Sequence, residues 1–380
     1  MTKNKLLILL VLYLGFVSLG LPDQVLGIAW PSMRQFFNKP LDWAGILVFI
    51  TAILTAVSGF SSGYFIRRYS ISAILITSGL LTAGGLSGYA FCQTSLFLIL
   101  ATIPLGIGAG TIDASLNDYV AQNYSPKHMN WLHGCWGIGA TLGPAIMTFS
   151  LGHHLGWRIG YGIIAALQLG LVIIFIATNS YWKRNKANQP ANNNVPQKIY
   201  KAAAYLSVSL FFIYTTCESS IGLWFFSVLT EYRHISIDTA GKFIVCYWAF
   251  LTFGRFGVGL FANRLGNRKV LFYSFLGSVA GLLMLLSEEK VVILTGLCLT
   301  GFSFSGIYPS MMHETPKRFG SKTGAYLTGF QAGAASLGVA LLTPLIGVFI
   351  SSAGMAFFIP ALLFLTLLMI ILNKKLNELT

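Results

Sequence analysis

Long apolar stretches separated by short polar gaps run along the whole chain, and their lengths predict membrane-spanning helices. A helix that crosses the hydrocarbon core needs about 20 mostly apolar residues. By that rule the sequence contains twelve candidate spans. They lie near residues 6–30, 43–66, 71–91, 95–120, 131–153, 157–179, 201–228, 239–262, 269–287, 291–311, 323–350 and 354–373. The first run is too long for the apolar core of a signal peptide, so we expect it to be a spanning helix as well.

One polar stretch interrupts this pattern in the middle of the chain. Residues 183–199 contain several Lys, Arg and Asn residues, and six candidate spans lie on each side of them. We therefore expect an N-terminal six-helix bundle over 1–182, a cytoplasmic linker over 183–199 and a C-terminal six-helix bundle over 200–380.

Short matches between the two halves recur at nearly the same offset. Residues 63–68 (GYFIRR), after the second span, resemble residues 259–264 (GLFANR), after the eighth. Residues 140–143 (ATLG) in the fifth span resemble residues 335–338 (ASLG) in the eleventh. Two parallel six-helix repeats are typical of the major facilitator fold, which places its substrate near the membrane midplane between the halves. Chance similarity between Gly-rich helices is the alternative.

Composition and charge support a lipid environment. The 380 residues are 55% hydrophobic and 9% charged, whereas a soluble domain has about 25% charged residues. The net charge of +14 does not indicate a nucleic-acid partner, because the basic residues lie in short gaps and not in one stripe. Most of them face one side if the N-terminus is inside, which predicts cytoplasmic termini in a bacterial inner membrane. The scattered Cys residues and the adjacent His pair have no metal-site spacing, so we expect no metal and no cofactor.

Three acidic residues within the spans are candidates for proton coupling. Asp23 follows Pro22 in the first span, Asp113 lies in the fourth, and Glu218 lies in the seventh. Ionisable residues inside a membrane are costly and usually functional, and a desolvated carboxyl group can take up and release a proton near neutral pH. Each also has a structural alternative. Asp23 would bond the backbone freed at Pro22, Asp113 would pair with a basic loop residue, and Glu218 would pair with a residue of the other half.

Polar and aromatic residues deep in the spans are candidates for substrate contact. An indole ring can stack on the apolar face of a sugar, although plain packing is the alternative for each aromatic residue, and a local hydrogen bond is the alternative for His133. The candidate binding residues are Gln24, Asn117, His133, Trp136, Trp224, Tyr247, Tyr308 and Gln331. The candidate gating residues are Arg67, Arg68, Asp118, Arg255 and Arg264. For Arg255, snorkelling towards the inner surface is the alternative.

Several of these segments resemble the fucose:proton symporter family of the major facilitator superfamily, which includes glucose-transporter-like branches. The segments are residues 113–120 (DASLNDYV), 130–140 (NWLHGCWGIGA), 218–224 (ESSIGLW), 254–256 (GRF) and 306–310 (GIYPS). The resemblance implies an all-α membrane protein of twelve helices in two pseudo-symmetric bundles. It implicates Asp113 in proton and substrate coupling, and Asn117 in contact with sugar or in helix packing. It also places His133 and Trp136 at the site and, more loosely, a coupling acid near Asp23.

The chain departs from the family pattern at several positions. Arg67 and Asn263 stand where the loop motifs normally have Asp, so the charge relay of the inner gate is altered in both halves. Asp113 replaces a longer Glu, and Trp136 replaces a polar residue. These two changes leave open whether the solute is another monosaccharide or a less polar compound.

The sequence thus favours a secondary active transporter and not an enzyme. We expect a monomer in the lipid bilayer that couples protons to the uptake of a monosaccharide or a similar small polar solute. Residues 137–144 (GIGATLGP) resemble the start of the antiporter motif but lack its final glycines. A proton-antiport exporter of drugs or metabolites is therefore the alternative, and sodium is an alternative coupling ion.

Overall fold

The computed structural model describes residues 3–124, 126–182 and 201–380, and every regular element in these ranges is a helix. The chain divides into two compact units, residues 1–189 and 190–380. The predicted linker over 183–199 lies outside the described residues. Each unit is described by itself below.

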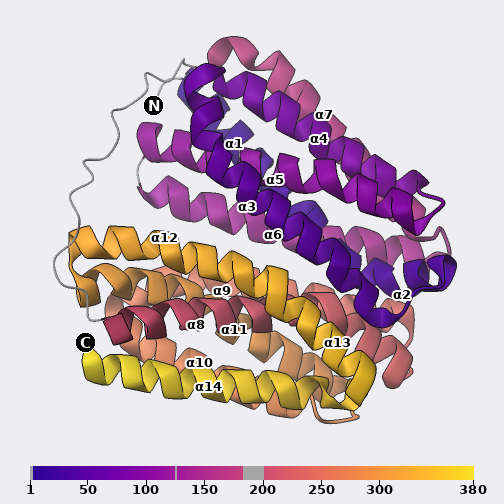
Figure 1. Ribbon diagram of the computed structural model, residues 1–380, viewed down its shortest axis with the longest axis vertical. Coiled ribbons are helices and arrows are strands. Elements are labelled where there is room, and N and C mark those ends of the chain that lie inside the picture. The colour runs from indigo at the N-terminus through magenta and orange to yellow at the C-terminus, as the bar shows by residue number, and fades with distance from the viewer. Residues whose placement is uncertain (1–2, 125, 183–200) are drawn as a thin grey trace. The chain divides into compact units, whose positions relative to one another are not determined.

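The first unit contains seven α-helices and two short 3₁₀ helices. They are α1 (Lys3–Asp23), α2 (Val25–Phe37), η1 (Leu41–Trp43), α3 (Ala44–Arg68), α4 (Ile71–Phe91), α5 (Ser95–Asn123), α6 (Pro126–Gly152), α7 (Trp157–Ala177) and η2 (Asn179–Tyr181). The long helices lie side by side as a bundle (Figure 1). Helix α1 packs on α6, α5 packs on both α3 and α4, and α4 packs on α7.

The second unit repeats this arrangement with more interrupted helices. Its elements are α8 (Lys201–Ser220), η3 (Ile221–Phe225), η4 (Val228–Tyr232), α9 (Ile237–Leu265), α10 (Asn267–Met284), α11 (Lys290–Phe319), α12 (Ser321–Leu337), η5 (Gly338–Leu342), α13 (Thr343–Ala353), η6 (Met355–Phe357) and α14 (Phe358–Leu379). Helix α8 packs on α12, α11 packs on both α9 and α10, and α10 packs on α14. These neighbours correspond one by one to those of the first unit.

The glycines of the sequence repeat take equivalent places in the two units. A Cβ atom added to Gly143 of α6 would lie 2.0 Å from the carbonyl oxygen of Leu21 in α1. A Cβ atom added to Gly338, which follows α12, would lie 2.2 Å from the carbonyl oxygen of Phe212 in α8. Small residues at such positions let helix backbones approach closely. The matching contacts support a true internal repeat over chance similarity.

Nine helical stretches in the described ranges are long and apolar enough to cross a membrane. Helices α6, α9 and α10 occupy the remaining three expected spans but are not among these nine stretches. All twelve predicted spans thus coincide with helices, and the fold class is confirmed, while the count of twelve crossings stays a prediction.

Within its described residues, the second unit contains three π-helical segments, η3, η4 and η5. η3 follows α8 directly, and η5 follows α12. The Thr216 hydroxyl donates to the Gly338 carbonyl at 3.2 Å, and the Thr215 hydroxyl donates to the Ala335 carbonyl at 2.8 Å. Hydroxyl groups of α8 therefore donate to backbone carbonyls at the point where the α-helix α12 passes into the π-helical segment η5.

Candidate functional site

The first span is broken beside its acidic residue. Helix α1 ends at Asp23 and α2 begins at Val25. Because Pro22 has no backbone N–H, the Ser18 carbonyl four residues earlier loses its helical partner. Gln168 of α7 replaces that partner, since its amide nitrogen donates to the Ser18 carbonyl at 2.7 Å. The expected effect of Pro22 is confirmed, and Gln168, not Asp23, satisfies the freed backbone.

Asp23 instead receives a hydrogen bond from the neighbouring helix. The indole Nε1 of Trp136 donates to Asp23 Oδ2 at 2.7 Å. The two helices touch here through their backbones, because a Cβ atom added to Gly20 would lie 2.1 Å from the Trp136 carbonyl oxygen. Asp23 is exposed and Trp136 is half-buried, so the carboxyl group is both held and accessible. Gln24 is half-buried in the break between the two helices.

Asp113 lies close enough to Asp23 for the two carboxyl groups to interact electrostatically. Asn117 is one turn along α5, and its amide nitrogen donates to the Asp113 side chain at 2.9 Å and to the Asp113 carbonyl at 3.0 Å. His133 precedes Trp136 by one turn of α6, is exposed, and packs edge-on against Phe16 of α1. The first unit therefore gathers two acids, an amide, an imidazole and an indole.

Glu218 has a different environment from the two aspartates. It is largely buried, and its carboxylate lies 3.1 Å from Arg255 Nη2 of α9. The Tyr214 hydroxyl, one turn earlier on α8, donates to the Glu218 carboxylate and to the Phe304 carbonyl. Glu218 thus has its ion-pair partner within its own unit, which differs from the suggested partner in the other half. The Arg255 side chain is 20% exposed and does not snorkel.

The remaining candidate binding residues of the second unit are mostly enclosed. Trp224 is fully buried and donates to the Thr343 carbonyl at 2.9 Å, and Gln331 is fully buried and donates to the Ser207 hydroxyl at 2.6 Å. Tyr247 is also fully buried, and its hydroxyl donates to the Glu218 carbonyl at 3.3 Å. Tyr308 is half-buried against Phe211 and Tyr214. These side chains brace the helices in this conformation, and only Tyr308 among them keeps substantial exposed surface.

Among the candidate gating residues, the structure describes two side chains. Arg68 is exposed and donates to the Tyr64 hydroxyl at 2.7 Å, and Arg255 pairs with Glu218 as above. The side chains of Arg67, Asp118 and Arg264 lie outside the described part of the chain.

Sequence reasoning missed an acidic residue at the end of α11. Glu314 is buried and accepts hydrogen bonds from Asn267 Nδ2 at 3.1 Å, Lys317 Nζ at 3.2 Å and Arg268 Nε at 3.4 Å. It joins the end of α11 to the start of α10. The spacing of Glu314 and Lys317, three residues apart on one helix, could have indicated an ion pair at this place.

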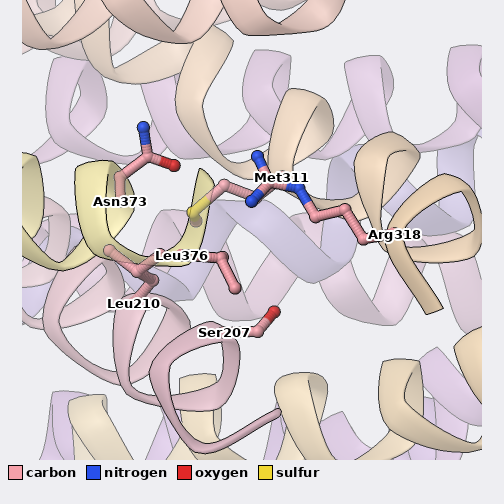
Figure 2. A pocket seen from close by; sticks show the side chains of 6 residues that line it. All are labelled: Ser207, Leu210, Met311, Arg318, Asn373 and Leu376. Carbon is pink, nitrogen blue, oxygen red and sulfur yellow. The ribbon is translucent and has the colours of Figure 1, made fainter. Parts of the chain in front are cut away.

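A small pocket lies within the second unit between α8, α11 and α14 (Figure 2). Its lining residues are Ser207, Leu210, Met311, Arg318, Asn373 and Leu376. The cavity measures about 10 Å³, which is room for one water molecule. A sugar therefore does not fit there. In the described ranges, no group of three or more metal-ligating side chains is clustered.

Comparison with known proteins places this arrangement in a family. The family model of the Major Facilitator Superfamily matches residues 12–227 and 206–376. A glucose/mannose transporter of Bacillus subtilis is 23% identical over 316 residues, covering 78% of this chain and 77% of the relative. A sodium-dependent glucose transporter of Danio rerio is 24% identical over 406 residues, and the match covers 95% of this chain and 67% of the relative.

Solved structures agree on the fold. A D-xylose–proton symporter aligns with a TM-score of 0.77 at 14% identity, covering 97% of each chain. A bacterial homolog of the human lysosomal transporter Spinster, in an inward-facing and occupied conformation, aligns with a TM-score of 0.78 at 13% identity, covering 100% of this chain and 98% of the other. With two family matches that together span nearly its whole length, the chain belongs to the Major Facilitator Superfamily and is a membrane transporter, not an enzyme.

Proposed function

We propose that this transporter couples the movement of protons to the uptake of a monosaccharide or a similar small polar solute. The observation that carries the proposal is the pair of carboxyl groups on Asp23 and Asp113. They lie within electrostatic range of each other, and in the ranges that the structure describes neither forms an ion pair with a basic side chain. Two neighbouring carboxyl groups disfavour double ionisation, so this pair is suited to taking up and releasing one proton.

The same region supports a hydroxyl-rich solute. Asn117 supplies amide donors and acceptors, His133 supplies an imidazole, and Trp136 supplies an aromatic face. Carboxylates and amides bind sugar hydroxyls, while an indole covers the apolar face of a ring. The named glucose/mannose transporter among the relatives supports the same class of solute for this chain.

Glu218 has a structural role in this proposal, unlike Asp23 and Asp113. Its charge is already balanced by Arg255 at 3.1 Å, so it holds the second unit together and is not the main proton carrier. Import is preferred over export, because the segment over residues 137–144 lacks the final glycines of the antiporter motif. We further propose a monomer in a bacterial inner membrane with both termini in the cytoplasm, working by alternating access.

The test is sugar uptake into proteoliposomes that hold the purified protein. An inward proton gradient should drive accumulation of labelled glucose or another monosaccharide. An inward sodium gradient, with the same pH inside and outside the vesicles, should not. The sodium arm matters because three relatives are named as sodium-dependent glucose transporters. Accumulation driven only by the sodium gradient would show that sodium, and not the proton, is the coupling ion. If no monosaccharide is taken up under either gradient, the proposed substrate class is wrong.

Asp113→Asn separates coupling from binding in the same assay. The variant keeps a polar side chain beside Asn117 but cannot release a proton. We expect it to lose gradient-driven accumulation while retaining exchange of labelled for unlabelled sugar. Full accumulation in this variant would return Asp113 to a structural role.

A further inference from the structure

We propose that Trp136 is a positioning residue whose indole N–H favours the ionised form of Asp23, so that protonation of Asp23 weakens this hydrogen bond. The inference deepens the proposed function and rests on it in one respect, namely that Asp23 exchanges a proton during transport.

The first argument is the direction of the hydrogen bond. An indole nitrogen can only donate, and it cannot accept. The Nε1 of Trp136 lies 2.7 Å from Asp23 Oδ2, so the bond is strongest when the carboxyl group is ionised. A donor to a charged carboxylate is worth more than a donor to a neutral acid, and the bond therefore opposes protonation.

The second argument is that the two side chains cannot easily drift apart while α1 and α6 stay in contact. The Trp136 backbone touches α1 at Gly20, where a Cβ atom would lie 2.1 Å from the Trp136 carbonyl oxygen. A Cβ atom added to Gly139, one turn further along α6, would likewise lie 1.9 Å from the carbonyl oxygen of Val17. Since the two backbones are in close contact here, this hydrogen bond is lengthened only by rotation of the indole or by separation of α1 from α6.

The third argument concerns the other groups around Asp23. Asp113 of α5 is the titratable group that acts on it electrostatically. Helix α7 contributes the uncharged Gln168, which is bonded to Ser18. On α6, His133 and Cys135 precede Trp136, and His133 packs on Phe16, two turns before Asp23. The Trp136 indole and the Asp113 carboxyl group therefore both act on the Asp23 carboxyl group.

Infrared titration of the purified protein in detergent tests the proposal without any sugar. The carbonyl stretch of protonated Asp23 is identified as the band that Asp23→Asn removes. In Trp136→Phe, which keeps an aromatic ring but has no N–H, the midpoint of this band should move to higher pH by about one unit. The matched control is Trp30→Phe, which removes an indole bond of 2.7 Å to the Leu41 carbonyl and should leave the midpoint unchanged. An unchanged midpoint in Trp136→Phe overturns the proposal.

A second measurement uses the unmodified protein in case Trp136→Phe does not fold. The Raman marker of indole hydrogen bonding should weaken as the pH falls, with the same midpoint as the Asp23 band, and this change should be absent in Asp23→Asn. A marker that does not vary with pH contradicts the proposal. Because neither measurement involves sugar, failure of the uptake assay and failure of this inference are distinguishable.

Discussion

At the scale of single residues, the polar groups of the first span are satisfied by other helices. Pro22 leaves the Ser18 carbonyl without its usual donor, and Gln168 supplies one from α7 at 2.7 Å. Ser18 is 6% exposed and Gln168 is 3% exposed, so no solvent can replace this contact. The break next to Asp23 therefore depends on a residue about 150 positions away in the chain.

Gln168→Leu should destabilise the protein. The substitution keeps the side-chain volume but leaves the buried Ser18 carbonyl without a donor, which costs about 1–3 kcal/mol. Thermal unfolding in detergent measures the effect. Ser18→Ala, which removes the hydroxyl that donates to Gln168 Oε1 but keeps the bond from Gln168 to the Ser18 carbonyl, is the comparison and should cost less. A melting temperature for Gln168→Leu equal to that of the parent protein would show that this carbonyl finds another donor.

The buried ion pair of the second unit allows a test by double substitution. Arg255→Met alone leaves the Glu218 carboxylate buried without its counter-charge, a change that costs about 3–5 kcal/mol in buried pairs. Adding Glu218→Gln to Arg255→Met should recover part of that loss, because the unpaired charge is removed. Denaturation of Arg255→Met, Glu218→Gln and the double variant measures the coupling. Additive losses would mean that the two side chains do not act as a pair.

The sequence indicated which acids lie within spans but not what each one contacts. Asp23, Asp113 and Glu218 could be recognised because charged residues are rare in apolar runs. The partners Trp136 and Arg255 could not, because helix packing brings them to the acids. The spacing of Asp113 and Asn117, four residues apart, did indicate that both face the same way. The spacing of Tyr214 and Glu218, four residues apart, was a readable signal. Nothing in the sequence distinguished Gln168 from any other polar residue in a span.

At the scale of the helices, close backbone contact at glycine defines the bundle in each unit. Gly143 brings α6 onto α1, and Gly338 brings the end of α12 onto α8. These residues belong to the ATLG and ASLG matches of the two halves. The repeat was therefore predictable from the sequence because the same packing contact needs the same small residue. Pro22 also indicated the helix break beside Asp23. The π-helical segments were not predictable, since they arise from local competition between backbone and side-chain partners.

Gly143→Ala and Gly338→Ala should each destabilise the bundle that contains them. The added methyl group meets a backbone carbonyl that cannot rotate away, and overpacking of this kind costs about 1–3 kcal/mol. Gly333→Ala on α12 is the matched control, because a Cβ atom there has no neighbour within 4 Å. Thermal unfolding compares the three. If the control loses as much stability as the other two, helix packing at these glycines is not the cause.

At the scale of the whole molecule, the ionisable groups of the two units are arranged differently. The first unit holds two carboxyl groups near each other, whereas the second holds a carboxylate balanced by a guanidinium group. Apolar patterning predicted the all-helical membrane fold correctly, because span length follows directly from bilayer thickness. It could not predict this asymmetry, since hydropathy does not record which side chains meet.

The most direct measurement of the central claim is proton movement that accompanies sugar. Proteoliposomes loaded with a pH-sensitive dye are given a monosaccharide without any imposed gradient, and their internal pH is followed. The proposed coupling through Asp23 and Asp113 predicts that sugar entry acidifies the lumen in the parent protein and that Asp113→Asn takes up sugar without acidification. Sugar entry with no change of internal pH in the parent protein would contradict the claim.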